Sequence, residues 1–144
     1  SYYIDKVPML CPIECAGPIP IRNDGRGEGD FGKKRNGNRT HQGIDIKAPL
    51  KTPIMAAKGG IARAGFHRKG LGKFVEIRHK NQMVTMYSHL HDIRIKPVQR
   101  VRQGQIIGSV GKTGNASYSG IEAHLHFEIR KNGKAVDPKK YLSI

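Results

Sequence analysis

Short alternating segments separated by turn residues constrain the fold of this chain more than any other feature. Seven segments alternate apolar and polar residues or are rich in β-branched residues, namely 43–46, 53–57, 60–64, 73–78, 83–89, 106–110 and 124–130. Turn-forming pairs stand at Lys69-Gly70, Lys80-Asn81 and Asn132-Gly133. No amphipathic helix of more than about two turns fits the sequence. We therefore predict an all-β fold of antiparallel sheets, with a small sandwich or barrel-like core and long cleft-forming loops.

The length of 144 residues predicts one hydrophobic core that needs no metal ion to hold it together. Residues 1–20 contain four prolines and are predicted to form an extended N-terminal lead-in, followed by a single domain over residues 21–144. Several glycines and no hydrophobic alternation predict a long polar loop over residues 21–38. No apolar run approaches the roughly 20 residues that span a bilayer, so no transmembrane segment is expected.

The charge of the chain is strongly unbalanced. Lys and Arg number 26 against 11 Asp and Glu, a formal net charge of +15. Such a surface attracts polyanions, whether nucleic acid, anionic lipid or an acidic cell-wall polymer, and the charge alone does not choose among them. Because the basic residues are scattered and no basic helix interleaved with aromatic residues appears, we do not expect nucleic-acid recognition. A monomer is expected.

The chain contains two cysteines, Cys11 and Cys15. The spacing suits a local disulfide that closes a tight loop in an oxidising compartment, and the alternative is two reduced thiols. The missing second pair of cysteines argues against a structural zinc site of four thiolates.

Two histidine-containing segments carry the chemistry, His41-Gln42-Gly43-Ile44-Asp45 and His124-Leu125-His126. On a strand, residues two or four apart point to the same face, so His41 would face the same way as Asp45, and His124 the same way as His126. Two imidazoles and one carboxylate are a common ligand set for a catalytic zinc ion, which leaves a fourth position for water. Spacing alone does not say whether His124 or His126 binds the ion.

A third segment, residues 84–89, adds a further histidine. Alternation predicts that Tyr87 and His89 share one face, and three imidazoles converge if this strand lies beside the one with His124 and His126. Tyr87 then either approaches the site or packs in the core. Glu128 follows His126 on the same face, where it either orients a ligand imidazole or packs against the surface.

Together these segments resemble the lysostaphin-type zinc endopeptidases, which cut peptide bonds in bacterial peptidoglycan and include the beta-lytic proteases. The signature of that family is a His-x-Gly-x-Asp segment followed much later by His-x-His. Other matching segments follow in the right order within residues 17–142: Phe31-Gly32-Lys33-Lys34-Arg35, Tyr87-Ser88-His89-Leu90, Gly104-Gln105-Ile106-Ile107-Gly108 and Val136-Asp137-Pro138. The stretch 117–123 departs from the family pattern, because it is longer and lacks the usual proline.

The resemblance implies a zinc-dependent endopeptidase acting on peptidoglycan peptides, in the periplasm or outside the cell. It implies that His41, Asp45 and His126 bind one Zn²⁺ ion, and that His89 and His124 are the two unligated catalytic histidines. We assign the proton shuttle to His124 and stabilisation of the transition state to His89, with the exchange of these roles as the alternative. Two other functions stay open: a catalytically inactive relative that binds cell wall or another polyanion, and a polyanion-binding protein that only stores zinc.

Overall fold

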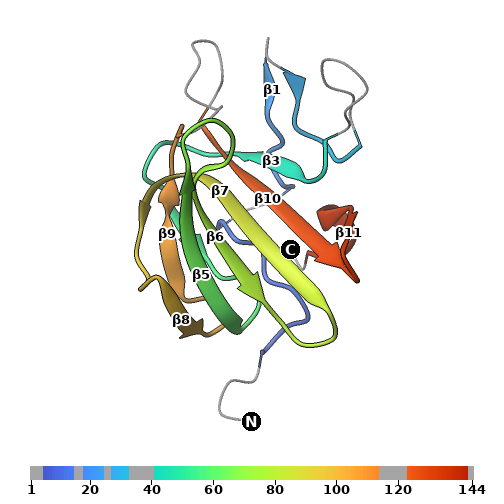
Figure 1. Cartoon of the computed structure of the whole chain (residues 1–144). Coiled ribbons are helices and arrows are strands. Elements are labelled where there is room, and N and C mark those ends of the chain that lie inside the picture. The colour runs from blue at the N-terminus through green and yellow to red at the C-terminus, as the bar shows by residue number, and fades with distance from the viewer. Residues whose placement is uncertain (1–4, 15–17, 25–26, 33–40, 114–122, 143–144) are drawn as a thin grey trace.

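The computed structural model describes residues 5–14, 18–24, 27–32, 41–113 and 123–142, and their regular structure is almost entirely β-strand (Figure 1). The elements are β1 Asn23–Asp24, β2 Gly27–Glu28, β3 Ile44–Lys47, β4 Pro53–Met55, β5 Gly60–His67, β6 Gly72–Arg78, β7 Met83–Ile93, β8 Val98–Val101, β9 Ile106–Val110, β10 His124–Lys131, β11 Lys134–Val136 and the single-turn 3-10 helix η2 Pro138–Lys140. Among these residues there is no α-helix, and the predicted all-β fold is confirmed. None of the described segments is a helix long and apolar enough to cross a membrane.

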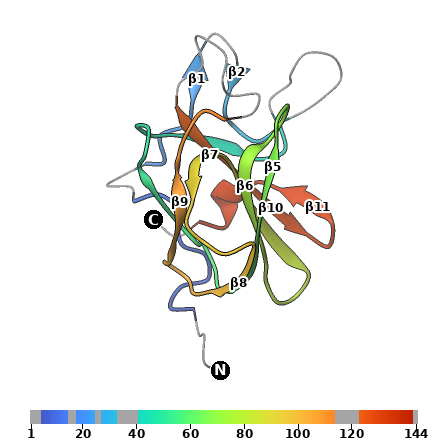
Figure 2. The ribbon, with the colours of Figure 1, turned by 60° about the vertical axis from the view of Figure 1, so that its left-hand side comes forward.

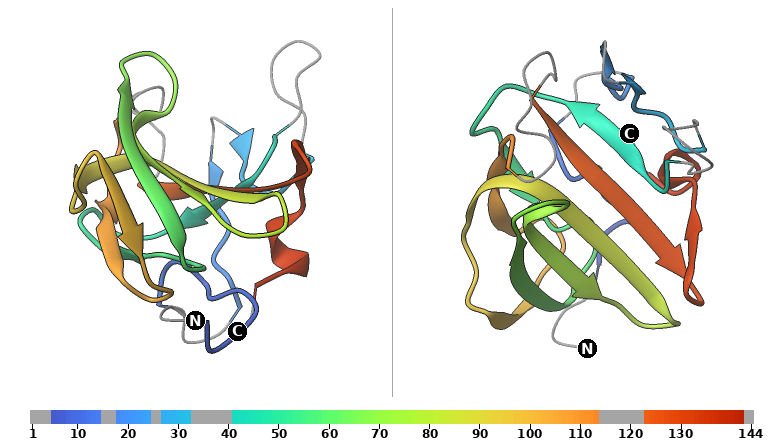
Figure 3. Two further views of the ribbon diagram at one scale, coloured as in Figure 1. Left: turned by 60° about the horizontal axis from the view of Figure 1, so that its bottom comes forward. Right: turned by 45° about the horizontal axis from the view of Figure 1, so that its top comes forward.

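Nine of these strands form one antiparallel sheet. Its main path runs β11-β10-β7-β6-β5-β8, with β3 beside β10, β9 beside β7 and β4 beside β9. The long strand β7 pairs with β10 along its first half and with β9 along its second half, and the sheet curls without closing (Figure 3). The β1–β2 pair lies at the same end of the molecule as β3 (Figure 2). The antiparallel arrangement is as predicted, in the form of an open sheet.

Strand register gives the sheet a core face and an outer face. Directly opposed residues on antiparallel strands share a face. One buried row of the core face crosses five strands and consists of Ala62, Ile77, Thr85, Ile129 and, less buried at the edge, Val136. The N-terminal segment covers this face, since Met9 and Ile13 belong to the buried core, and Figure 3 (left) shows that segment beneath the sheet. The opposite, outer face is therefore left for the functional side chains.

The turns follow from residues that tolerate a left-handed backbone. Asn81 and Gln82 have φ of 61° and 60°, and Asn132 and Gly133 have φ of 52° and 79°. Two successive residues with positive φ give the type I′ hairpin turn that matches strand twist. The turn predicted at Asn132-Gly133 is confirmed, and the one predicted at Lys80-Asn81 lies one residue later, at Asn81-Gln82. Strands β8 and β11 were not predicted: the two valines of β8 are three residues apart, which breaks the two-residue period of a strand, and the three residues of β11 do not alternate.

Three expectations concern residues outside the described part of the chain. Much of the long polar loop and of the stretch that departs from the family pattern falls within residues 33–40 and 114–122. Cys15 is also among the residues that are not described, so the disulfide with Cys11 stays a prediction.

Candidate metal centre

The five predicted site residues lie together on the outer face of the sheet. His126 on β10 is directly opposite Asp45 on β3, and β7 pairs with the other side of β10. His124 lies two residues before His126 on the same face, His41 comes from the segment before β3, and His89 comes from β7. All five side chains are buried. Strand pairing therefore assembles the cluster from three segments far apart in the sequence.

Three of these side chains direct their donor atoms at one another. His41 Nε2 lies 3.1 Å from Asp45 Oδ1 and 3.1 Å from His126 Nδ1, while His126 Nδ1 lies 2.7 Å from Asp45 Oδ1. His124 stands slightly apart, with Nε2 3.9 Å from Asp45 Oδ1. Of the two histidines between which spacing did not choose, His126 is therefore the one grouped with His41 and Asp45.

Each of the two imidazoles in this group has an acceptor for its other ring nitrogen. His41 Nδ1 donates to the backbone carbonyl of Asp30 at 3.0 Å. His126 Nε2 lies 2.7 Å from Glu128 Oε2, and the other oxygen of Glu128 accepts from Arg130 at 2.9 Å. Such partners fix the tautomer and the ring orientation of metal-binding histidines. Of the two roles considered for Glu128, the structure therefore shows contact with His126.

Arg22 holds the remaining oxygen of Asp45. Its Nη2 and Nε atoms lie 3.0 and 3.1 Å from Asp45 Oδ2, and both side chains are buried. Oδ1 alone is left for His41 and His126. Sequence reasoning missed Arg22 and Asp30, because both lie in the glycine-rich segment without periodicity, where no residue pattern marks a contact.

Glycine at position 43 is required by packing. A Cβ added to Gly43 would collide with the backbone of Phe127 and with the side chain of Glu128. The glycine of the His-x-Gly-x-Asp segment therefore lets the chain between His41 and Asp45 lie close against β10. Gly43 thus allows His41 and Asp45 to reach the site and does not itself line it.

His89 reaches the cluster through a left-handed backbone. Its φ is 64°, and the pairing of β6 with β7 shifts register at this point. The prediction that Tyr87 and His89 share a face is wrong: Tyr87 packs in the core against Phe127, whereas His89 turns to the outer face. The predicted convergence of imidazoles is nevertheless present, since the ring centroid of His89 lies 5.4 Å from that of His124. An irregular strand, invisible to alternation, produces it.

Electrostatics in the cluster follow from burial and hydrogen bonding. Burial alone raises the pKa of Asp45, but hydrogen bonds from His126 and His41 outweigh it and hold that pKa well below its usual value. Burial alone lowers the pKa of His126, but the carboxylates of Asp45 and Glu128 outweigh it and raise the pKa to about 9. The two carboxylates therefore favour the charged form of the His126 ring.

The donor set fits a zinc ion. Two imidazole nitrogens and one carboxylate oxygen, separated by 2.7 to 3.1 Å, are ligands that Zn²⁺ accepts with bonds of about 2.0–2.2 Å. The outward-facing nitrogens are already held by Asp30 and Glu128. The site thus offers three oriented protein ligands, the number typical of catalytic zinc.

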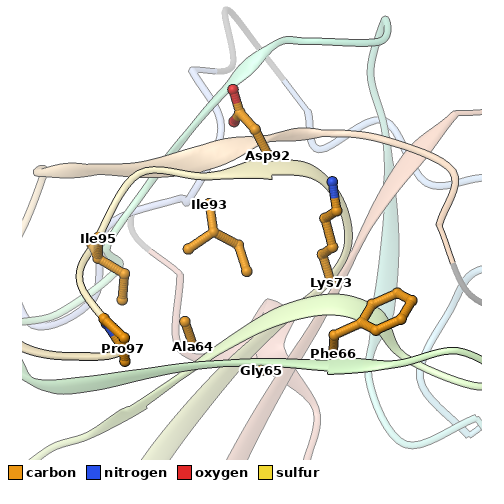
Figure 4. Close-up of a pocket in the computed structure, with 8 residues that line it drawn as sticks. All are labelled: Ala64, Gly65, Phe66, Lys73, Asp92, Ile93, Ile95 and Pro97. Carbon is orange, nitrogen blue, oxygen red and sulfur yellow. The ribbon is translucent and has the colours of Figure 1, made fainter.

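A hollow of about 640 Å³ is lined by residues other than these five (Figure 4). Its walls are mostly apolar and come from β5, the end of β7 and the segment before β8, with Lys73 and Asp92 at one rim. The backbone N–H of Lys73 donates to Thr113 Oγ1, and the carbonyl of Thr113 accepts from His89 Nδ1 at 2.8 Å. The lining residue Lys73 therefore contacts Thr113, the residue that binds His89. None of the residues that line the hollow is one of the five site residues.

Comparison with known proteins places the chain in a family. The model of peptidase family M23 matches residues 39–138. The chain is 39% identical over 101 residues to the peptidoglycan DD-endopeptidase ShyC of Vibrio cholerae, covering 70% of this chain and 22% of that protein. It is 36% identical over 120 residues to the murein hydrolase activator NlpD of Salmonella dublin, covering 83% of this chain and 30% of that protein. The chain thus spans less than a third of the length of these two curated relatives.

Solved structures agree with the sequence comparison. The catalytic domain of the prophage-encoded M23 protein EnpA from Enterococcus faecalis, crystallised as a mutant, is 34% identical, with a TM-score of 0.69 over 91% of this chain and 97% of that chain. A zinc-containing peptidase from Vibrio cholerae is 27% identical, with a TM-score of 0.70 over 93% of this chain and 38% of that chain. The resemblance predicted from the two histidine segments is confirmed: the chain belongs to peptidase family M23.

Proposed function

We propose that this chain is a zinc-dependent endopeptidase that hydrolyses peptide bonds in bacterial peptidoglycan, and that it acts in the cell envelope. The observation that supports this most strongly is the convergence of His41 Nε2, Asp45 Oδ1 and His126 Nδ1, flanked by two further imidazoles. A stored metal ion needs only the ligands. Two extra buried histidines beside them are what hydrolysis needs for proton transfer.

His41, Asp45 and His126 would hold the ion. Zinc, when bound, supplies a Lewis acid that polarises a carbonyl and lowers the pKa of water toward about 7. Arg22 keeps one oxygen of Asp45 engaged, and Glu128 keeps His126 in the tautomer that leaves Nδ1 for the metal. These contacts hold the ligands in place before substrate arrives.

The state of His89 argues for exchanging the roles assigned from the sequence. Its Nδ1–H donates to the Thr113 carbonyl, so Nε2 carries the lone pair of a neutral imidazole. Burial, with the neighbouring His126 and His124, lowers the pKa of His89 to about 3. A neutral ring of this tautomer accepts a hydrogen bond at Nε2 and has no N–H for an oxyanion. His89 therefore orients the attacking water as an acceptor.

His124 is then the donor. Its Nε2 lies 3.9 Å from Asp45 Oδ1, beside the three converging donor atoms and outside their group. An N–H at this nitrogen would be suited to stabilise the carbonyl oxygen and to protonate the leaving amine. The pH-rate profile distinguishes the two roles. His89→Ala should change the acidic limb, which depends on the base, and His124→Ala the alkaline limb, which depends on the acid. Identical changes in both variants would contradict the assignment.

A second function has one observation in its favour, the identity of 36% to a murein hydrolase activator. Under this alternative the chain binds a partner in the cell wall and cleaves nothing. The five site residues are all present here, which favours the enzyme.

Release of new amino groups from purified peptidoglycan tests the choice. Native protein and His126→Ala are compared with and without zinc, on glycine-bridged and on directly crosslinked peptidoglycan. Zinc-dependent cleavage that is lost in the variant supports the enzyme and identifies its bond class. Absence of cleavage by zinc-loaded native protein on both substrates overturns it in favour of the activator.

A further inference from the structure

A row of arginines crosses the outer face of the sheet. Strand register places Arg100, Ile61, Arg78, Val84 and Arg130 directly opposite one another on β8, β5, β6, β7 and β10, in that order. Because opposed residues share a face, these side chains form one continuous row. With neighbouring strands about 4.8 Å apart, the row is about 19 Å long and has an arginine on every second strand.

This row is open to solvent on the outer side of the sheet. The side chains of Arg78 and Arg130 are 69% and 40% exposed. The other side of the sheet is covered by the core and by the N-terminal segment, as Figure 3 (left) shows. The row is thus a surface feature and takes no part in core packing.

The neighbouring row adds a fourth arginine and two carboxylates. Arg63 is opposite Glu76, and further along the same row lies Glu128. Glu128 contacts His126 and Arg130, and Glu76 lies 3.5 Å from Arg78, so each carboxylate already has one of the arginines beside it. We name the surface formed by Arg63, Arg78, Arg100 and Arg130 the arginine face. Its arginines outnumber its carboxylates, and the net charge of +15 strengthens the positive potential.

The arginine face is continuous with the metal centre. Arg130 and His126 lie on one strand and one face, four residues apart, which corresponds to about 13 Å. A peptide that branches from a polymer bound to the arginines therefore needs to extend only about 13 Å to reach the metal ligands. A surface used only for solubility needs no such alignment.

We propose that the arginine face binds the acidic peptidoglycan strand itself, through carboxylates of successive stem peptides, and so holds a neighbouring peptide at the metal centre. This inference rests on the proposed function, since it names the surface that carries the proposed substrate. Guanidinium groups pair with carboxylates through two parallel hydrogen bonds, and repeated, spaced arginines match a repeated anion better than a single charge does. The ordered row on the same face as the metal ligands is the observation that favours substrate over an unrelated polyanion.

The test compares two charge-reversal variants of equal net charge. Arg63→Glu with Arg78→Glu changes the arginine face, and Lys51→Glu with Lys96→Glu changes two exposed lysines in loops elsewhere. Neither pair touches the metal ligands or their contacts. Each protein is assayed for co-sedimentation with insoluble peptidoglycan at several salt concentrations, and for cleavage of a short soluble stem-peptide substrate.

The arginine-face variant should lose about tenfold or more in affinity for peptidoglycan and most of its salt dependence, while cleavage of the soluble peptide changes less than about twofold. The lysine variant should keep both. Equal loss in the two variants, or no loss in either, overturns the proposal. If native protein cleaves neither substrate, the proposed function fails, and this outcome is separate because sedimentation does not depend on cleavage.

Two further arms complete the test. Arg63→Gln with Arg78→Gln should give a smaller loss of the same kind, and zinc content with thermal unfolding checks that each variant is folded. Short duplex DNA is added as a competitor. If DNA displaces the native protein more effectively than soluble peptidoglycan fragments of equal charge concentration, the assignment to peptidoglycan is overturned.

Discussion

Two groups of polar side chains on opposite faces of the sheet contain histidine, and only one of them is arranged for a metal ion. At the metal centre, His41 Nε2, His126 Nδ1 and Asp45 Oδ1 all approach one point within 2.7 to 3.1 Å of each other. On the core side, His79, Thr85 and Tyr87 form a chain. Three donor atoms that converge on one point can bind a single ion, whereas the hydrogen-bonded chain of His79, Thr85 and Tyr87 offers no such point.

The hydrogen bonds of the core chain run in one consistent direction. The N–H of Ala57 donates to the Tyr87 hydroxyl, which lies 2.8 Å from Thr85 Oγ1. Thr85 lies 2.8 Å from His79 Nε2, and His79 Nδ1 donates to the carbonyl of Gly59 at 2.7 Å. Each donor thus meets one acceptor, and burial lowers the pKa of His79, which keeps the ring neutral. The same residue type is structural here because its nitrogens are matched in pairs.

Replacing one of the three converging side chains should have the largest effect on zinc binding. His126→Ala removes a nitrogen ligand from the metal centre, and we expect loss of the bound zinc ion at micromolar metal concentration. His79→Ala is the control, since it breaks the core chain, and it should keep one zinc per chain. Metal content after dialysis measures both. Retention of zinc by His126→Ala would contradict the assigned ligands.

Weakening the support behind a ligand should have a smaller effect. Glu128→Gln keeps the shape of the side chain but removes the charge that faces His126 Nε2, and a change of this kind costs about 10–100-fold in metal affinity. Glu76→Gln, on the same face but directed to Arg78, is the matched control. Competition with a zinc chelator compares them, and equal affinities in the two variants would show that Glu128 does not support the ligand.

Lower pH should weaken zinc binding because protons compete for His126. Its pKa is about 9 without metal, so below that pH a proton leaves Nδ1 when zinc binds. The apparent affinity should fall about tenfold for each unit that the pH is lowered below 9, until other ligands also protonate. Calorimetry in buffers of different ionisation enthalpy counts the protons released. Binding at pH 7 without proton release would refute the prediction.

The core chain should respond in stability alone. Tyr87→Phe leaves the N–H of Ala57 without its acceptor and removes the donor to Thr85, at a cost of about 1–3 kcal/mol in the free energy of unfolding. Zinc affinity should be unchanged. Urea unfolding and chelator competition separate the two quantities, and a loss of zinc affinity would show that the two regions are coupled.

The sequence predicted what depends on periodicity and on donor chemistry. Alternation located most strands, and turns are present at Asn132-Gly133 as predicted and one residue beyond the predicted pair Lys80-Asn81, at Asn81-Gln82. Even spacing correctly placed His124 and His126 on one face of β10, whereas His41 reaches Asp45 from the segment before β3. These features depend only on residues that are close together in the sequence.

Contacts between distant segments and breaks in regularity were not predictable in the same way. Arg22 reaches Asp45 from a segment with no pattern, and nothing in its neighbours marks it as buried. His89 reaches the site through a positive φ, which reverses the face that alternation assigns to it. The length of β7 beyond residue 89 depends on its pairing with β9, a strand that follows later in the chain.

Anomalous diffraction at the zinc absorption edge, from crystals of zinc-loaded protein, tests the contrast most directly. We predict one zinc ion, bound by His41 Nε2, Asp45 Oδ1 and His126 Nδ1, with His89 and His124 beside it and no anomalous density at His79. A zinc ion bound instead through His79, or absence of density at the three converging donors, would contradict it.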